Sequence, residues 1–231
     1  MQETVIRPIA HVYTDFAEKF GIPRQSGLVE ELCGRVVFES EYRRKEAFRR
    51  IEEFSHLWLI WQFSKAVTQE FHPTVRPPRL GGNERVGVFA SRAPYRPNSL
   101  ALSCVKLLKV DWDAPDGPAL IIGGVDMLSG TPVFDVKPYI PVADCRPEAT
   151  QGYTRETREH LLTVEIGEEF LPLIPADKLS ALRGVLQRDP RPGYQDDKNT
   201  VYGMEFAGMD VGFTVDKETL RVVRVTYKEE K

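Results

Sequence analysis

The chain has 231 residues, of which 42% are hydrophobic and 28% are charged, and its formal net charge is −3. This composition is that of an ordinary globular protein, and no apolar run approaches the length of a membrane span. The charge balance argues against a nonspecific nucleic-acid coat, although it permits a local basic patch. The first residues lack the pattern of a signal peptide, so we expect a cytoplasmic protein.

Strands are expected throughout the first 142 residues, because apolar or alternating segments of strand length recur between turn residues. They cover residues 5–13, 34–39, 56–63, 86–90, 100–110, 119–125 and 133–140. Helical spacing of apolar residues predicts one short helix over residues 42–54. Frequent strands without an alternating strand-helix pattern favour a barrel or a sandwich over a doubly wound fold.

The last third of the chain has a different pattern. The polar, unpatterned stretch 143–160 contains a linker, which we place at residues 146–160. A helix is expected over residues 177–187, followed by strands over 201–206, 210–215 and 220–227. The predicted fold is therefore mainly β: a single β-barrel domain (1–145) with one or two short helices, and a small α+β C-terminal domain (161–231).

Metal and disulfide chemistry have little support in the sequence. Cys33, Cys104 and Cys145 lie far apart, and the chain contains no CxxC, HxxxH or HExxH motif. We therefore expect no metal site and no disulfide, with the cysteines packed as small side chains.

The segment 71–103 has an unusual charge pattern, with five arginines, no lysine and one acid, Glu84. Its prolines and glycines exclude a helix and predict a long ordered loop around a short strand. Arginine without lysine is typical of bidentate recognition of phosphate or carboxylate. The alternative is a surface loop whose arginines are simply solvated.

Short motifs, taken in order along the chain, point to one family. They are Phe20-x-x-Pro23-Arg24-Gln25, Phe54-Ser55-His56-Leu57-Trp58, Thr74-Val75-Arg76-Pro77-Pro78-Arg79-Leu80-Gly81-Gly82-Asn83, Gly87-Val88-Phe89-Ala90-x-Arg92, Arg96-Pro97-Asn98, Asp126-x-x-x-Gly130-Thr131-Pro132, Asp135-x-Lys137-Pro138-Tyr139 and Asp189-Pro190-Arg191-Pro192-x-Tyr194. Through them the chain resembles the TrmO (YaeB/TsaA-like) family of S-adenosylmethionine-dependent tRNA methyltransferases. The resemblance implies a homodimer whose β-barrel binds S-adenosylmethionine. It also implies methylation of N6 of N6-threonylcarbamoyladenosine beside the tRNA anticodon.

The resemblance also implies a cofactor pocket built from several separate segments. Its expected members are Pro23, Arg24, Gln25, Ser64, Lys65, Arg92, Leu102, Gly123, Gly124, Val125 and Asp126. A guanidinium on a proline-rigidified loop suits the methionine carboxylate. The two glycines would let backbone approach a ligand, or they mark a bulge in a barrel strand. Many relatives have a histidine where this chain has Ser64.

Methyl transfer to the ureido N6 requires assistance, because its lone pair is delocalised and its proton must leave. A positioned base and close alignment would supply this. Asp126 is the first candidate base because it ends a strand beside the proposed cofactor segment, and a turn cap is its alternative role. Tyr139 and Asp135 are the other candidates, whereas His56 is more typical of a core group.

Arginine and tyrosine side chains are the candidate contacts to the tRNA anticodon loop, through phosphates, the threonyl carboxylate and unstacked bases. They are Arg76, Arg79, Arg85, Tyr95, Arg96, Arg191 and Tyr194. For Arg191 the alternative is a structural ion pair. Two other functions are considered: a non-catalytic barrel that binds RNA or a nucleotide-like ligand, and a methyltransferase acting on a small molecule.

Overall fold

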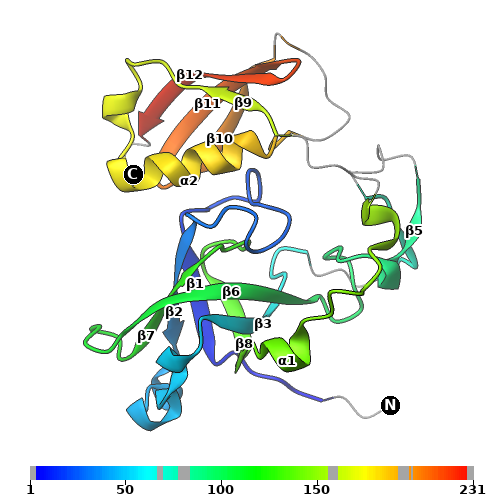
Figure 1. Ribbon diagram of the computed structural model, residues 1–231, viewed down its shortest axis with the longest axis vertical. Coiled ribbons are helices and arrows are strands. Elements are labelled where there is room, and N and C mark those ends of the chain that lie inside the picture. The colour runs from blue at the N-terminus through cyan, green and yellow to red at the C-terminus, as the bar shows by residue number, and fades with distance from the viewer. Residues whose placement is uncertain are drawn as a thin grey trace.

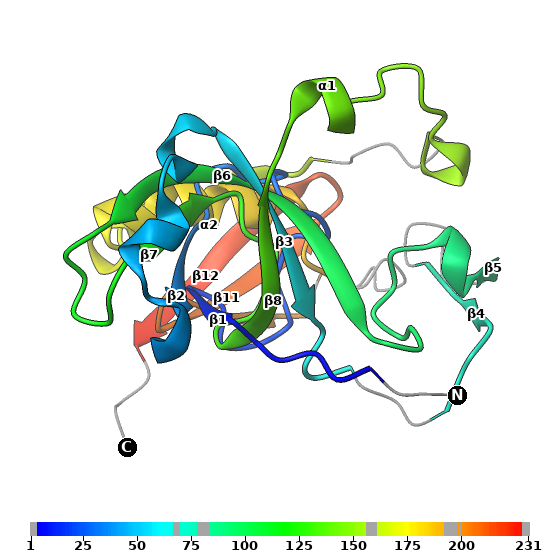
Figure 2. The same ribbon diagram turned by 90° about the horizontal axis from the view of Figure 1, so that it is seen from below.

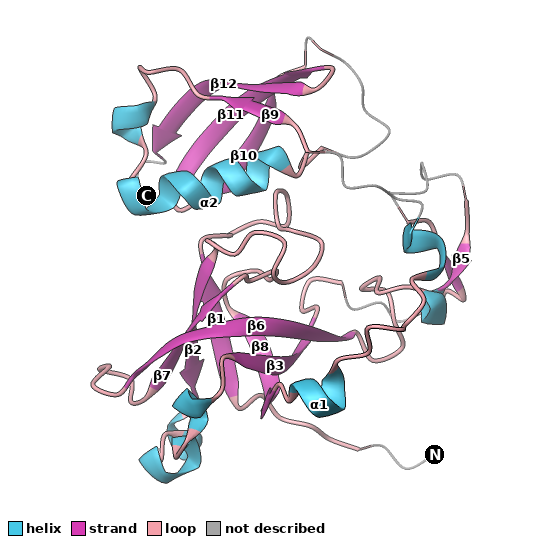
Figure 3. Ribbon diagram, viewed as in Figure 1, coloured by secondary structure: helices cyan, strands magenta, loops and turns pink. Residues whose placement is uncertain are grey.

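The computed structural model describes residues 4–66, 70–77, 84–155, 161–191, 198 and 200–227. Two predicted tRNA contacts, Arg79 and Tyr194, lie outside these residues. Figure 1 shows an N-terminal body, which is a barrel, and above it a smaller C-terminal body with one longer helix. Strands dominate both bodies (Figure 3), which confirms the mainly β prediction.

A closed barrel forms the N-terminal body, with strand order β1-β2-β7-β6-β3-β8 (Figure 2). Each neighbouring pair is antiparallel. Burial alternates along β3, which is the period-two pattern of a strand with one face in the core. The strands are β1 (Ala10–Thr14), β2 (Cys33–Phe38), β3 (His56–Gln62), β6 (Leu100–Asp111), β7 (Ala119–Gly123) and β8 (Thr131–Pro138).

The arginine-rich segment forms a separate arm beside the barrel. In it β4 (Thr74–Val75) pairs with β5 (Val86–Gly87), and both lie to one side of the barrel in Figure 2. The strand expected over 86–90 is shorter than predicted, because Val88–Ala90 turns into a 3-10 helix. We call the described residues 70–77 and 84–96 the arm.

The helix predicted over residues 42–54 is wrong. That region contains short 3-10 turns at Lys45–Phe48 and Ile51–Glu53, preceded by another at Ser40–Tyr42. Arg50 has a left-handed φ of 71°, a conformation that a continuous right-handed helix cannot contain. One of the apolar residues that suggested this helix does face the core, because Phe48 is buried and packs edge-on against Phe38.

The C-terminal body packs α2 (Ala176–Gln187) against a four-stranded sheet of order β10-β11-β12-β9. The predicted meander is present as β10 (Tyr202–Phe206), β11 (Met209–Asp216) and β12 (Thr219–Tyr227). An additional short strand, β9 (Thr163–Glu165), pairs in parallel with β12 and was not predicted. Two 3-10 turns, Gly152–Arg155 and Leu171–Leu173, and the short α1 (Pro141–Asp144) complete the elements. No helix in the described parts of the chain has the length and apolar character needed to cross a bilayer.

The connection between β1 and β2, residues 15–32, reaches from the barrel to the C-terminal body (Figure 1). We call it the bridging loop. Phe16 packs edge-on against Phe206, and Phe20 stacks on Phe213, with ring centroids 5.4 and 6.4 Å apart. The buried residues of both bodies therefore form one continuous apolar cluster.

Candidate functional site

A cavity of about 710 Å³ opens between the bridging loop, the barrel and the arm. That volume falls in the range of small-molecule sites. Trp58, Ile60 and Leu102 give it an apolar wall. The predicted cofactor residues Pro23, Arg24, Gln25, Ser64, Lys65, Arg92, Leu102 and Asp126 all line it.

The floor of the cavity contains a chain of hydrogen bonds formed by Trp61, Ser103 and Asp126. The Ser103 hydroxyl donates to the Asp126 carboxylate at 2.7 Å, and the indole N–H of Trp61 donates to the same hydroxyl at 2.9 Å. Ser103 is only 2% exposed, so its hydroxyl has little access to water. These contacts fix the orientation of the carboxylate, and we call the three residues the polar chain.

Sequence reasoning missed two members of the polar chain, Ser103 and Trp61. A usable signal was present for the serine. Ser103 and Val105 face inward on β6, so Ser103 is a polar side chain in a position of the core face. A buried hydroxyl there requires a partner, and Asp126 is the partner that the fold supplies.

Burial raises the pKa of Asp126 to about 6, well above the ordinary value of a carboxyl group. Hydrogen bonds from Ser103 and the Ser26 backbone amide, and the charge of Arg92, act in the opposite direction. At neutral pH the carboxylate is therefore ionised, yet it is more basic than an exposed aspartate. That is the property expected of a general base.

Internal contacts hold the mouth of the cavity together. The Arg92 guanidinium donates to the side-chain oxygen of Gln25, which joins the arm to the bridging loop. Lys19 Nζ donates to the backbone carbonyl of Lys65 at 2.7 Å, which joins the loop to the residues after β3. The cavity walls thus come from distant segments that contact one another directly.

Three predicted cofactor residues, Gly123, Gly124 and Val125, do not line the cavity. Gly123 belongs to the β7 ladder, and Val125 is buried in the core. Gly124 has a φ of 70°, and its carbonyl accepts a hydrogen bond from the Gly27 amide at 2.9 Å. A Cβ at Gly124 would come within 3.0 Å of the Gly27 backbone. The absence of side chains at Gly123 and Gly124 allows the bridging loop to lie close to the barrel. This close packing is the reason for glycine at both positions.

The second candidate base, Tyr139, does not line the cavity either. Its ring lies 5.6 Å from that of Trp58 and 6.3 Å from that of His56. Asp135 is also absent from the lining, and its carboxylate pairs with Lys137 at 2.8 Å. Asp126 is therefore the only one of the three candidate bases that the described structure brings to the cavity.

The arginines of the arm have different environments. Arg96 lines the cavity, but its guanidinium donates to the carbonyls of Val88 and Ser91 and lies over the Phe89 ring. Arg85 donates to the Thr74 hydroxyl at 3.0 Å, across the β4–β5 pair. Arg76 and Tyr95 are exposed. Arg76 and Tyr95 thus have the exposure that an RNA contact requires, whereas Arg96 supports the fold of the arm.

Arg191 forms the structural ion pair that was its alternative role. It is 9% exposed, and its guanidinium binds both carboxylate oxygens of Asp189 at 2.8 and 2.9 Å. A buried, bidentate pair of this kind leaves the guanidinium little capacity for a phosphate.

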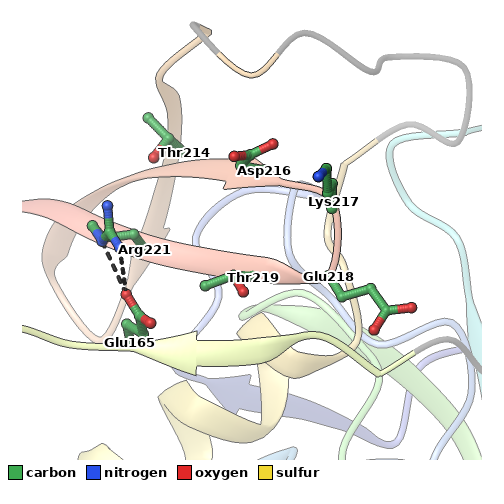
Figure 4. Close-up of a pocket in the computed structure, with 7 residues that line it drawn as sticks. All are labelled: Glu165, Thr214, Asp216, Lys217, Glu218, Thr219 and Arg221. Carbon is green, nitrogen blue, oxygen red and sulfur yellow. Dashed lines mark hydrogen bonds and ion pairs between the residues drawn. The ribbon is translucent and has the colours of Figure 1, made fainter.

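A second cavity, of about 550 Å³, lies on the C-terminal body beside the β11–β12 hairpin and β9 (Figure 4). Arg221 and Glu165 are paired across it at 2.8 Å, and its other side chains are polar. No predicted site residue lines it. Among the described residues, no group of His, Cys, Asp and Glu side chains is arranged to hold a metal ion.

Comparisons with known proteins identify the family. Residues 11–145 match the family model of the tRNA-methyltransferase O N-terminal domain, and residues 169–228 match that of the TrmO C-terminal domain. The Escherichia coli K12 tRNA (adenine(37)-N6)-methyltransferase is 38% identical over 205 residues, covering 83% of this chain and 84% of that protein.

Two further relatives extend the comparison. A Pyrococcus abyssi protein named "Probable S-adenosyl-L-methionine-binding protein" is 37% identical, covering 76% of this chain and 92% of its own. The crystal structure of TrmO from Pseudomonas aeruginosa has a TM-score of 0.79 and 28% identity, and covers 99% of both chains. The chain belongs to the tRNA-methyltransferase O (TrmO) family.

Proposed function

We propose that this chain is an S-adenosylmethionine-dependent methyltransferase that methylates N6 of adenosine 37 in tRNA, and that its substrate base is N6-threonylcarbamoyladenosine. One structural observation carries the proposal. The cavity that collects the predicted cofactor residues also contains a buried, ionisable carboxylate held by the polar chain. Family membership and the names of the relatives support the same reaction.

The residues around the cavity fit the proposed cofactor chemically. Arg24 offers a cation to the methionine carboxylate, and the apolar wall of Trp58, Ile60 and Leu102 suits an adenine ring. Asp126 offers an anion to the positively charged part of the cofactor. When bound, S-adenosylmethionine supplies an electrophilic methyl group on a sulfonium.

Asp126 is the residue that we assign to proton removal. With S-adenosylmethionine bound, N6 would form its bond to the methyl carbon as the bond from that carbon to sulfur breaks and leaves a neutral thioether. The Asp126 carboxylate would accept the N6 proton. Ser103 holds one carboxylate oxygen through its hydrogen bond. Because a general base acts best when its pKa lies near the operating pH, a pKa of about 6 favours this role.

The arm is the proposed contact with the anticodon loop. Arg76 and Arg85 are exposed cations suited to phosphates, and Tyr95 is an exposed ring suited to stacking on an unpaired base. We further propose a cytoplasmic homodimer and the domain division 1–145, 146–160 and 161–231. The matched ranges 11–145 and 169–228 support that division.

A methylation assay tests the proposed function. Purified protein is incubated with methyl-labelled S-adenosylmethionine and tRNA that carries or lacks threonylcarbamoyladenosine. We expect label in the modified tRNA only, recovered as the N6-methyl derivative after nuclease digestion. Labelling of both tRNAs would contradict the proposed substrate. Binding of tRNA without any methyl transfer would favour a non-catalytic RNA-binding barrel.

A further inference from the structure

No described residue of the C-terminal body lines the cavity, whose lining runs from Lys19 to Thr131. Five lining residues nevertheless belong to the bridging loop: Lys19, Ile22, Pro23, Arg24 and Gln25. Phe16 and Phe20 of the same loop pack against Phe206 and Phe213 of the C-terminal body. The loop is therefore a physical connection between that body and the cavity.

Polar contacts join both ends of the bridging loop to the C-terminal body. At its start, the Asp15 carboxylate binds Lys178 Nζ at 2.7 and 2.9 Å, and the Asp15 carbonyl accepts from the Ala207 amide at 2.9 Å. Near its end, Arg188 donates to the Leu28 carbonyl at 2.7 Å. Lys178 and Asp15 are 27% and 17% exposed, so this ion pair is shielded from water more than a surface pair.

Gly21 lies between a residue that packs on the C-terminal body and two residues that line the cavity. Before it, Phe20 stacks on Phe213, and after it Ile22 and Pro23 line the cavity. Gly21 has a φ of 90°, and a Cβ built there would overlap the sulfur of Met204. Met204 is 1% exposed on β10, so its side chain can yield only by disturbing the core.

We propose that the C-terminal body positions the cofactor-binding side of the bridging loop. Met204, packed against Gly21, and Lys178, paired with Asp15, are its positioning residues. The physical reason is preorganisation. A loop of this length, if unsupported, samples many conformations, and the binding free energy must then include the cost of ordering it. The inference rests on the proposed function, because it concerns affinity for S-adenosylmethionine.

Gly21→Ala tests the inference, with S-adenosylmethionine binding measured by calorimetry. The added methyl group displaces the loop, and we expect Kd to rise about tenfold, because the cavity-lining side of the loop is no longer preorganised for the ligand. Met204→Ala alone removes the buried side chain that packs against Gly21, so it should raise Kd as well. In steady-state assays, KM for S-adenosylmethionine should rise while kcat at saturation is retained.

Gly117→Ala is the matched control. Gly117 lies in the hairpin between β6 and β7 and has a φ of 80°, and the three atoms nearest to an added Cβ all belong to the Arg43 side chain. It should lower the melting temperature without changing Kd. Lys178→Met is a second variant in case Gly21→Ala does not fold, and it too should raise Kd.

Two outcomes separate this inference from the proposed function. Wild-type protein that binds S-adenosylmethionine, with unchanged Kd in folded Gly21→Ala or Lys178→Met, would overturn the positioning role alone. An unchanged Kd in folded Met204→Ala would overturn the role of Met204. Wild-type protein that does not bind S-adenosylmethionine would overturn the proposed function and this inference together.

Discussion

The cavity floor and the arm both present polar side chains, but those side chains are held in different ways. On the floor, Ser103 receives a hydrogen bond from Trp61 and donates one to Asp126, all within the barrel. On the arm, Arg76 and Tyr95 are exposed, and Arg96 turns inward to hold backbone carbonyls.

The buried floor is therefore suited to chemistry, and the exposed arm to recognition of RNA. A reacting group requires a fixed orientation and a shifted pKa, and both come from burial. A contact to RNA phosphates requires a cation that remains accessible. Variants of the floor should therefore change rate and pH dependence, whereas variants of exposed arm residues should change tRNA affinity.

Asp126→Asn should have the largest effect. Removing the proposed base is expected to lower kcat by about 10²- to 10⁴-fold. In the wild type, kcat should fall as pH drops below about 6, because protonation removes the base. The measurement is kcat across pH 5 to pH 9 under saturating substrates. A variant that retains more than a tenth of the wild-type rate would exclude Asp126 as the base.

The same variant should stabilise the protein at neutral pH. Because burial raises the pKa of Asp126, the folded state binds this proton more tightly than the unfolded state. Stability therefore falls as pH rises from about 4 through about 6, and asparagine avoids that loss. We expect a gain on the order of 1–3 kcal/mol at pH 8 that shrinks near pH 4, measured by denaturant unfolding. Equal stability of both proteins at pH 8 would contradict burial as the cause of the shift.

Ser103→Ala should have an intermediate effect. It removes a donor to Asp126 and leaves the Trp61 N–H without its acceptor, at a cost of about 1–3 kcal/mol of stability. Because the Ser103 hydrogen bond lowers the pKa of Asp126, its loss should move the acid limb of the kcat profile to higher pH. Ser99→Ala, another buried serine but outside the cavity lining, should leave that limb in place.

Arg76→Ala should have the smallest effect, confined to tRNA. Loss of one phosphate contact should weaken tRNA binding uniformly and reduce the slope of log K against log salt by about 1, with S-adenosylmethionine binding unchanged. Arg96→Ala should instead lower the melting temperature and disturb the cavity, because Arg96 supports the arm. Filter binding at several salt concentrations, beside thermal melts, separates the two. Identical behaviour of both variants would contradict the different roles assigned to Arg76 and Arg96.

The sequence predicts the barrel well because half-buried strands impose an alternation that is visible locally, as in β3. It fails over residues 42–54, where helical spacing of apolar residues coexists with the left-handed Arg50. It also misses β9, whose three residues are too short to show a pattern and whose pairing with β12 is distant in sequence.

Residues that belong to a sequence motif could be assigned to the candidate site in advance. Residues whose position depends on tertiary packing could not. The motif residues Pro23, Arg24, Gln25 and Arg92 do meet at one cavity. The glycine pair at 123–124 and the inward turn of Arg96 depend on contacts with Gly27 and Val88, which no local pattern reveals. The support that the C-terminal body gives to Gly21 is likewise a product of tertiary packing.

The most direct test of the central claim is a calorimetric titration of the wild-type protein and Arg92→Ala with S-adenosylmethionine. Arg92 lines the cavity and holds Gln25, so its loss removes a charge and frees the bridging loop from the arm. We expect saturable binding by the wild type with a micromolar Kd, and at least a tenfold weaker Kd for the variant. Absence of binding by the wild type at millimolar ligand, or equal binding by both proteins, would contradict the assignment of this cavity to the cofactor.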